Sequence, residues 1–159
     1  MRAPARHLIV LLWFVGGATA IVRLVFRDPR FDYRLLALGA LLPDAVDALL
    51  GGARVLHAVV APVSVLLVTM VGTVGRRPLR RRLLAVPIGM FLHLVLDGVF
   101  RDTRVFWWPF TGLALPSARL PSVTRGWWDV PLELVGLVLV VRFGPLLRGR
   151  ADEPADSVR

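Results

Sequence analysis

His93 and Asp97 are the two side chains in this sequence whose spacing most clearly allows chemistry. They lie in the stretch 89–97, GMFLHLVLD, in which the remaining residues are apolar or glycine. Residues four apart on a helix share one face, so the imidazole and the carboxylate project together from a hydrophobic segment. Ionisable groups in such surroundings cost free energy unless they find partners. The pair therefore indicates either a functional site or a hydrogen-bonded pair that fixes helix packing.

A second pair of ionisable groups, Asp44 and Asp47, lies in the apolar segment Leu35–Leu50. Side chains three apart on a helix also share a face. Two neighbouring carboxylates repel each other unless one is protonated or a cation lies between them. Pro43 is expected to break or kink this segment. Asp44 alone would be explained as the cap of a helix that starts after the break, but Asp47 would not.

Two further histidines complete the set of potential metal ligands. His57 lies at the start of the apolar run Val55–Val74, and His7 precedes the first apolar run, Leu8–Val22. The chain has no cysteine, so a metal site must use imidazole and carboxylate, which suit Zn²⁺, Mn²⁺ or Fe²⁺. We therefore expect a divalent metal held by some of the following residues: Asp44, Asp47, His57, His93, Asp97 and His7.

Apolar runs recur along the whole chain and predict an all-α protein. They are Leu8–Val22, Leu35–Leu50, Val55–Val74, Leu83–Phe100 and Pro131–Leu147. With 56% hydrophobic residues in 159, the chain reads as a polytopic transmembrane helix bundle of about five helices. The second run is short, so it is either a fifth span or a Pro-broken or re-entrant helix beside four spans.

The organisation expected from these runs is a single transmembrane domain over residues 1–147. Residues 148–159 form a polar C-terminal tail, which is expected to be disordered. Gly89 lies one helical turn before His93 and is expected to allow a neighbouring helix to approach closely.

The charge of the chain comes from arginine. The net charge is +9 and there is no lysine; five arginines fall in the segment Arg76–Arg82, RRPLRRR. Arginines between apolar runs mark the cytoplasmic side of a membrane and meet anionic lipid headgroups. We therefore expect an integral protein of the bacterial cell (inner) membrane with membrane lipids as partners. The positive-inside pattern explains the arginines without a nucleic-acid partner, and the sequence leaves the oligomeric state open.

Four segments, in order, resemble a known family. LGALLPDAVDALL (38–50), a helix opened by His57, GMFLHLVLDGVF (89–100) and FWWPFTG (106–112) are similar to the membrane-bound metal-dependent hydrolase family, also called YdjM-like. The resemblance covers about residues 7–115 and includes a histidine near the N-terminus, the position of His7. Arg54 and Ala58 differ from the family pattern around His57. The resemblance implies a metal-dependent hydrolase.

Two functions remain open at this point. The first is hydrolysis of an ester or phosphoester of a lipid-linked or amphipathic substrate by metal-activated water, with Asp44 or Asp47 as general base. The second is a non-catalytic membrane protein in which the histidines and aspartates form a structural polar network or an ion or proton path.

Overall fold

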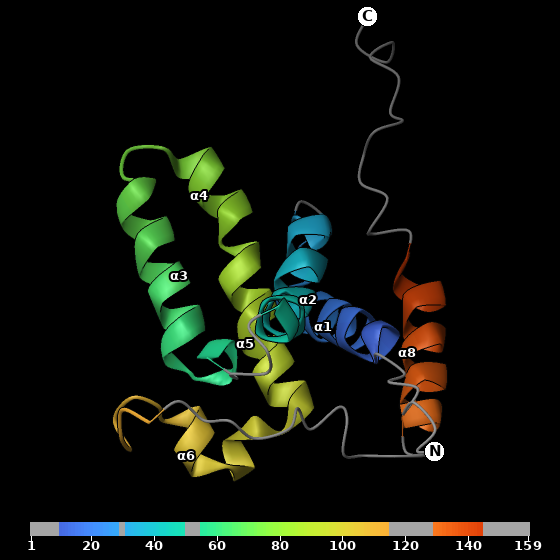
Figure 1. Cartoon of the computed structure of the whole chain (residues 1–159). Helices are drawn as coiled ribbons and strands as arrows, with labels where there is room; N and C mark the ends of the chain where they lie inside the picture. The colour runs from blue at the N-terminus through green and yellow to red at the C-terminus, as the bar shows by residue number, and fades with distance from the viewer. Residues whose placement is uncertain (1–9, 29–30, 50–54, 115–128, 145–159) are drawn as a thin grey trace, which may run out of the picture.

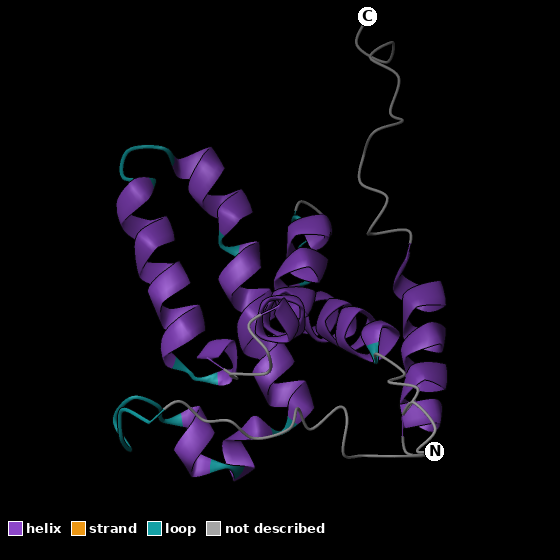
Figure 2. Ribbon diagram, in the orientation of Figure 1, coloured by secondary structure: helices purple, strands orange, loops and turns teal. Residues whose placement is uncertain are grey.

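The computed structural model describes residues 10–28, 31–49, 55–114 and 129–144, and the regular elements in these ranges are helical (Figures 1 and 2). The α-helices are α1 (Leu11–Phe26), α2 (Tyr33–Leu49), α3 (Val60–Gly72), α4 (Arg77–Leu83), α5 (Ala85–Asp97), α6 (Thr103–Phe106) and α8 (Asp129–Phe143). Two 3-10 turns precede helices: η1 (Val55–His57) lies before α3, and η2 (Val99–Arg101) lies before α6. The all-helical character expected from the sequence is observed throughout these ranges. The predicted tail, 148–159, lies outside them.

The predicted transmembrane bundle is wrong for the described part of the chain. The longest helix there, α2, has 17 residues and α1 has 16. None of the helices in the described ranges combines the length and the apolar character needed to cross a membrane, for which about 20 consecutive apolar residues are required. This finding also overturns the expected inner-membrane location.

The long apolar runs are divided by breaks in the helices. The run Val55–Val74 begins with the turn η1, which leaves 13 residues for α3. The run Leu83–Phe100 leaves 13 residues for α5, because Gly98 adopts a left-handed conformation (φ 72°) that ends the helix. These two apolar runs are therefore longer than the helices they form, whereas the helices α1 and α2, with 16 and 17 residues, are about as long as the runs that predict them.

The arginine-rich segment 76–82, which lies between two of the apolar runs, is not an irregular connection, because most of it forms the helix α4. Two of its arginines make ion pairs with the chain between α1 and α2. Arg81 binds Asp28, and Arg82 Nε lies 3.2 Å from Asp32 Oδ2. Part of the arginine cluster thus holds α4 against the start of α2.

The pair α2 and α5 forms the centre of the fold (Figure 1). A Cβ atom placed on Gly39 would lie 2.2 Å from the carbonyl oxygen of Val86, and one on Gly89 would lie 2.3 Å from that of Leu36. The two backbones therefore touch directly at these glycines, as small residues allow. The expected role of Gly89 is confirmed, and the contact sets the distance across which α2 and α5 present their polar side chains.

Candidate metal centre

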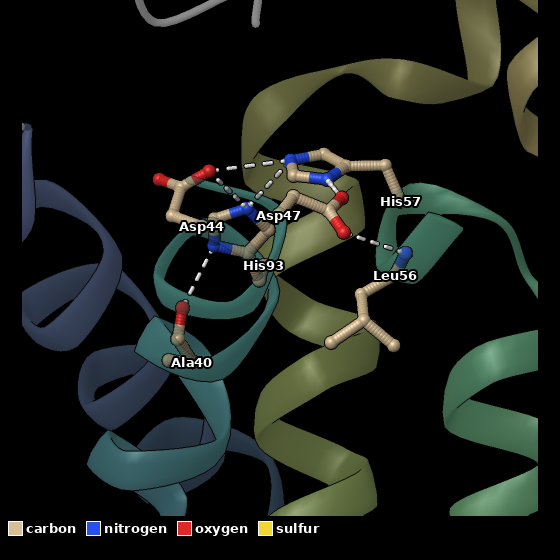
Figure 3. Close-up of polar contacts among 6 residues, drawn as sticks. All are labelled: Ala40, Asp44, Asp47, Leu56, His57 and His93. Atoms are coloured by element: carbon tan, nitrogen blue, oxygen red, sulfur yellow. Dashed lines mark hydrogen bonds and ion pairs between the residues drawn. The ribbon is translucent and has the colours of Figure 1, made fainter. Parts of the chain in front are cut away.

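Three of the predicted ligands meet in one place. Asp44 comes from α2, His57 from η1 and His93 from α5 (Figure 3). Asp44 Oδ1 lies 3.3 Å from His57 Nε2 and 3.5 Å from His93 Nε2, and the two Nε2 atoms are 3.3 Å apart. These three atoms form a nearly equilateral triangle between three elements that are distant in sequence.

The second nitrogen of each imidazole is held by the protein (Figure 3). His93 Nδ1 donates a hydrogen bond to the carbonyl oxygen of Ala40, at 2.7 Å. His57 Nδ1 donates to Asp47 Oδ2, also at 2.7 Å, and Asp47 Oδ1 accepts a bond from the Leu56 amide at 3.1 Å. Because each Nδ1 carries a proton, a neutral imidazole has its lone pair on Nε2. Both lone pairs therefore face the carboxylate of Asp44.

The dimensions of the triangle suit a metal ion. In a tetrahedral site with ligand bonds of about 2.0–2.1 Å, neighbouring ligand atoms are about 3.3–3.4 Å apart. The observed separations of 3.3, 3.3 and 3.5 Å correspond to one face of such a tetrahedron. The group of Asp44, His57 and His93 could therefore bind a metal ion.

The centre is buried but opens at Asp44. The His57 and His93 side chains are 1% and 0% exposed, whereas that of Asp44 is 13% exposed. Water or a small molecule would thus approach from the Asp44 side. The ring of Phe14, fully buried, packs against His93 with centroids 4.0 Å apart and the two rings tilted by 31°.

The electrostatics of the centre favour a cation between His57 and Asp44. Burial raises the pKa of Asp44, but hydrogen bonds with His57 and His93 outweigh this effect and hold the pKa well below its usual range. Burial lowers the pKa of His57, yet the carboxylates of Asp44 and Asp47 raise it overall to about 9. Without a metal, His57 therefore carries a second proton at neutral pH. A metal ion would compete with that proton for the same lone pair.

The other predicted site residues lie elsewhere. Asp47 lies behind His57, where it binds Nδ1 rather than facing the triangle. Asp97 is buried one turn after His93, and its charge contributes to the raised pKa of His57. His7 lies outside the described residues. The three ligand atoms thus come from half of the predicted set, and Asp47 has a different role from the one expected.

Two groups that contact His93 were not predicted from the sequence. The carbonyl of Ala40 orients His93, and the ring of Phe14 packs on it. Side-chain types cannot reveal a main-chain acceptor, although Ala40 is four residues before Asp44 and so shares its helix face. Phe14 could be found only by knowing how α1 packs on α5.

Comparisons of the chain with protein-family models, with curated proteins and with solved structures found no match. These comparisons therefore assign no function to the chain.

Proposed function

We propose that Asp44, His57 and His93 bind a divalent cation, Zn²⁺, Mn²⁺ or Fe²⁺, and that this centre hydrolyses an ester or phosphoester. The observation that carries the proposal is the triangle of acceptor atoms. When both imidazoles are neutral, two nitrogen lone pairs and one carboxylate oxygen face one another within 3.5 Å, and a cation among them stabilises that arrangement. Two nitrogens and one oxygen, without sulfur, are a donor set that these ions accept.

Three protein ligands are the number found in catalytic zinc sites, where the fourth position holds water or substrate. A divalent cation bound in this way lowers the pKa of its water and polarises an ester or phosphoester oxygen. The exposed side of Asp44 gives substrate a route to the centre. The chain's resemblance to a family of metal-dependent hydrolases implies the same class of reaction.

The protein groups have separate tasks in this proposal. His57 and His93 bind the ion through Nε2, and Asp47 and the Ala40 carbonyl hold the two rings in the orientation that this requires. Both oxygens of Asp47 already accept hydrogen bonds. Of the two carboxylates predicted as general base, Asp44 is therefore better placed to take a proton from water, through the oxygen that does not bind the ion.

The test is the metal content and thermal stability of the purified chain. We expect about one divalent ion per chain in the wild type, and a lower melting temperature after chelation, since a ligand bound only to the folded state stabilises it. Asp44→Asn should lose the ion. Asp32→Asn is the matched control, because Asp32 lies at the other end of α2 from Asp44 and pairs with Arg82. Substoichiometric metal in the wild type, with no response to chelator, would contradict the proposal.

A structural polar network is the second candidate, and the raised pKa of His57 favours it. A proton on His57 Nε2 would satisfy Asp44 without any metal, because a protonated imidazole donates from both nitrogens. This candidate is supported if His93→Ala lowers stability to the same extent with and without added metal. The metal proposal requires the loss to be larger when metal is present.

A further inference from the structure

The helices α3 and α4 form a hairpin at one edge of the molecule (Figure 1). Within α3 only Ala61 and Pro62, both in its first turn, are buried. Along the rest of the helix Val63, Leu67 and Val71 are 43%, 58% and 73% exposed. These positions are four residues apart, so they form one apolar face along α3 that no described element covers.

The exposed apolar surface also extends around the helix. Val68, about 100° around the helix axis from Leu67, is 72% exposed, and Val74, in the turn after α3, is 74% exposed. The sequence 58–75 contains no charged residue. Single exposed apolar side chains are normal, but a continuous apolar surface marks a contact with another protein or with a membrane. Whatever covers α3 must therefore be apolar itself.

A cluster of arginines adjoins this surface. Arg76, Arg77 and Arg80 follow α3 directly, and they make no ion pair with any residue that the structure describes. The other two arginines of α4 are the ones paired with aspartates at the start of α2. Between Asp47 and Asp97 the sequence has no acidic residue. The hairpin thus places uncompensated positive charge beside an exposed apolar face.

This combination identifies the occupant by its chemistry. An anionic lipid surface offers acyl chains to an apolar helix face and phosphate groups to arginines at the end of that helix. A second copy of the hairpin would bring the same arginines and no acidic residue to meet them. A partner helix would cover one stripe of α3 and leave Val68 in water, whereas acyl chains can follow a surface that curves around the helix.

We propose that the hairpin of α3 and α4 binds the surface of an anionic lipid membrane. In this arrangement α3 lies at the boundary between headgroups and acyl chains, and Arg76, Arg77 and Arg80 contact lipid phosphates. The 13 residues of α3 make it about 20 Å long, less than the hydrocarbon thickness of about 30 Å. The contact therefore involves one leaflet and needs no helix that crosses the membrane. It also goes beyond the proposed function, because it does not depend on the metal centre.

The test is flotation of the purified full chain with lipid vesicles. Vesicles of phosphatidylcholine alone are compared with vesicles that also contain phosphatidylglycerol, at low and at high salt. We expect tighter binding to the anionic vesicles and a loss of that preference at high salt, where charges are screened. Replacing Arg76, Arg77 and Arg80 together by Gln should lower the affinity by about 100-fold, since each arginine near an anionic surface contributes about fivefold.

Matched variants on α8 separate the hairpin from the rest of the surface. Arg77→Gln should lower the affinity for anionic vesicles by about fivefold, whereas Arg142→Gln, at an exposed position of α8, should leave it unchanged. Val71→Asn should lower it by about tenfold, because an apolar side chain no longer leaves water on binding. Val138→Asn makes the same change at a position of α8 that is 65% exposed, and should have no effect.

Three outcomes would overturn the inference. The first is equal affinity for neutral and anionic vesicles, and the second is equal binding by the hairpin variants and their α8 controls. The third is no binding to either kind of vesicle. In that case a dimer in sedimentation velocity that Val71→Asn dissociates would assign the apolar face to a second copy, and a monomer would assign it to another protein.

Discussion

Two helix pairs in this fold make backbone contacts through glycine, α2 with α5 and α1 with α8. In the second pair a Cβ atom on Gly136 would lie 2.3 Å from the backbone of α1, as close as the Gly89 contact in the first. Both pairs also carry a partly buried carboxylate. Glu133 of α8 accepts hydrogen bonds from the Leu12 amide at the start of α1, at 3.1 and 3.2 Å, whereas Asp44 faces two imidazoles.

The neighbours of each carboxylate decide what it does. Burial raises the pKa of Glu133, although the amides of Leu12 and Leu11 lower it. These amides are donors that a helix start leaves without partners, so Glu133 caps α1. The two histidines beside Asp44 each direct Nε2 toward it, so that carboxylate pairs with either a protonated His57 or a metal ion. The difference separates a structural acid from a candidate ligand, and the following variants test it.

Removing a ligand should have the largest effect. We expect His93→Ala to abolish stoichiometric metal binding, because one corner of the triangle is lost and two ligands remain. Glu133→Gln should keep the full metal content, since its carboxylate lies at the start of α1. Metal analysis by mass spectrometry of both proteins measures this. Equal metal loss in the two variants would contradict the distinction between Asp44 as a candidate ligand and Glu133 as a helix cap.

The metal-free protein should lose stability as the pH rises. The pKa of His57 is raised from 6.5 to about 9 in the folded state, so its contribution is complete below pH 6.5 and is lost as the pH rises through about 9. The loss should reach roughly 3 kcal/mol. Urea unfolding with chelator between pH 6 and pH 10 measures it. His57→Gln should flatten the profile, and an unchanged slope in that variant would assign the pH dependence to another group.

The two glycine contacts can be broken in parallel. Gly89→Ala and Gly136→Ala should each lower the free energy of unfolding by about 1–3 kcal/mol, because a methyl group would meet backbone atoms that cannot easily move. Only Gly89→Ala should also weaken metal binding, since it separates the helices that carry Asp44 and His93. Chemical denaturation and metal titration of both variants measure the two effects. Metal binding that falls equally in both would contradict the specific role of the α2–α5 contact.

Removing the group behind a ligand should have the smallest effect. Asp47→Asn keeps the shape of the side chain but weakens the acceptor of the His57 Nδ1 proton. Loss of such an outer partner lowers metal affinity by about 10–100-fold. Glu133→Gln, which makes the corresponding change in the other helix pair, should leave the affinity unchanged. Competition with a chromogenic chelator gives both values, and wild-type affinity in Asp47→Asn would remove Asp47 from the centre.

The sequence allowed the site to be predicted better than the fold that surrounds it. The spacing of Asp44 and Asp47 placed both on one face of a helix, and the absence of cysteine limited the ligand types. The sequence could not show that Asp47 would bind Nδ1 of His57, because that contact depends on how the turn η1 orients the ring. The i+4 spacing of Asp97 from His93 was equally uninformative about the distance of Asp97 from Asp44.

The membrane prediction failed for a physical reason that composition cannot reveal. Hydrophobic runs count residues, but the length of a helix also depends on where the backbone leaves the helical conformation, as at Gly98. The arginines of α4 were interpreted as markers of topology. Arg81 and Arg82 instead have carboxylate partners, Asp28 and Asp32, about fifty positions earlier in the chain, and pairs so distant in sequence could not be anticipated.

The bond from His93 to the Ala40 carbonyl makes the orientation of this ligand depend on the position of α2. A main-chain acceptor remains when the side chain at position 40 is replaced, so the orientation of His93 depends on where α2 lies rather than on which residue occupies that position. A shift of α2 along or away from α5 would therefore move Asp44 together with both groups that orient the imidazoles, because the Ala40 carbonyl and the Asp47 carboxylate also belong to α2. In a Co²⁺-substituted protein such a shift would change the ligand field and therefore the visible absorption. The displacement of a helix could then be followed by absorption spectroscopy without an attached dye.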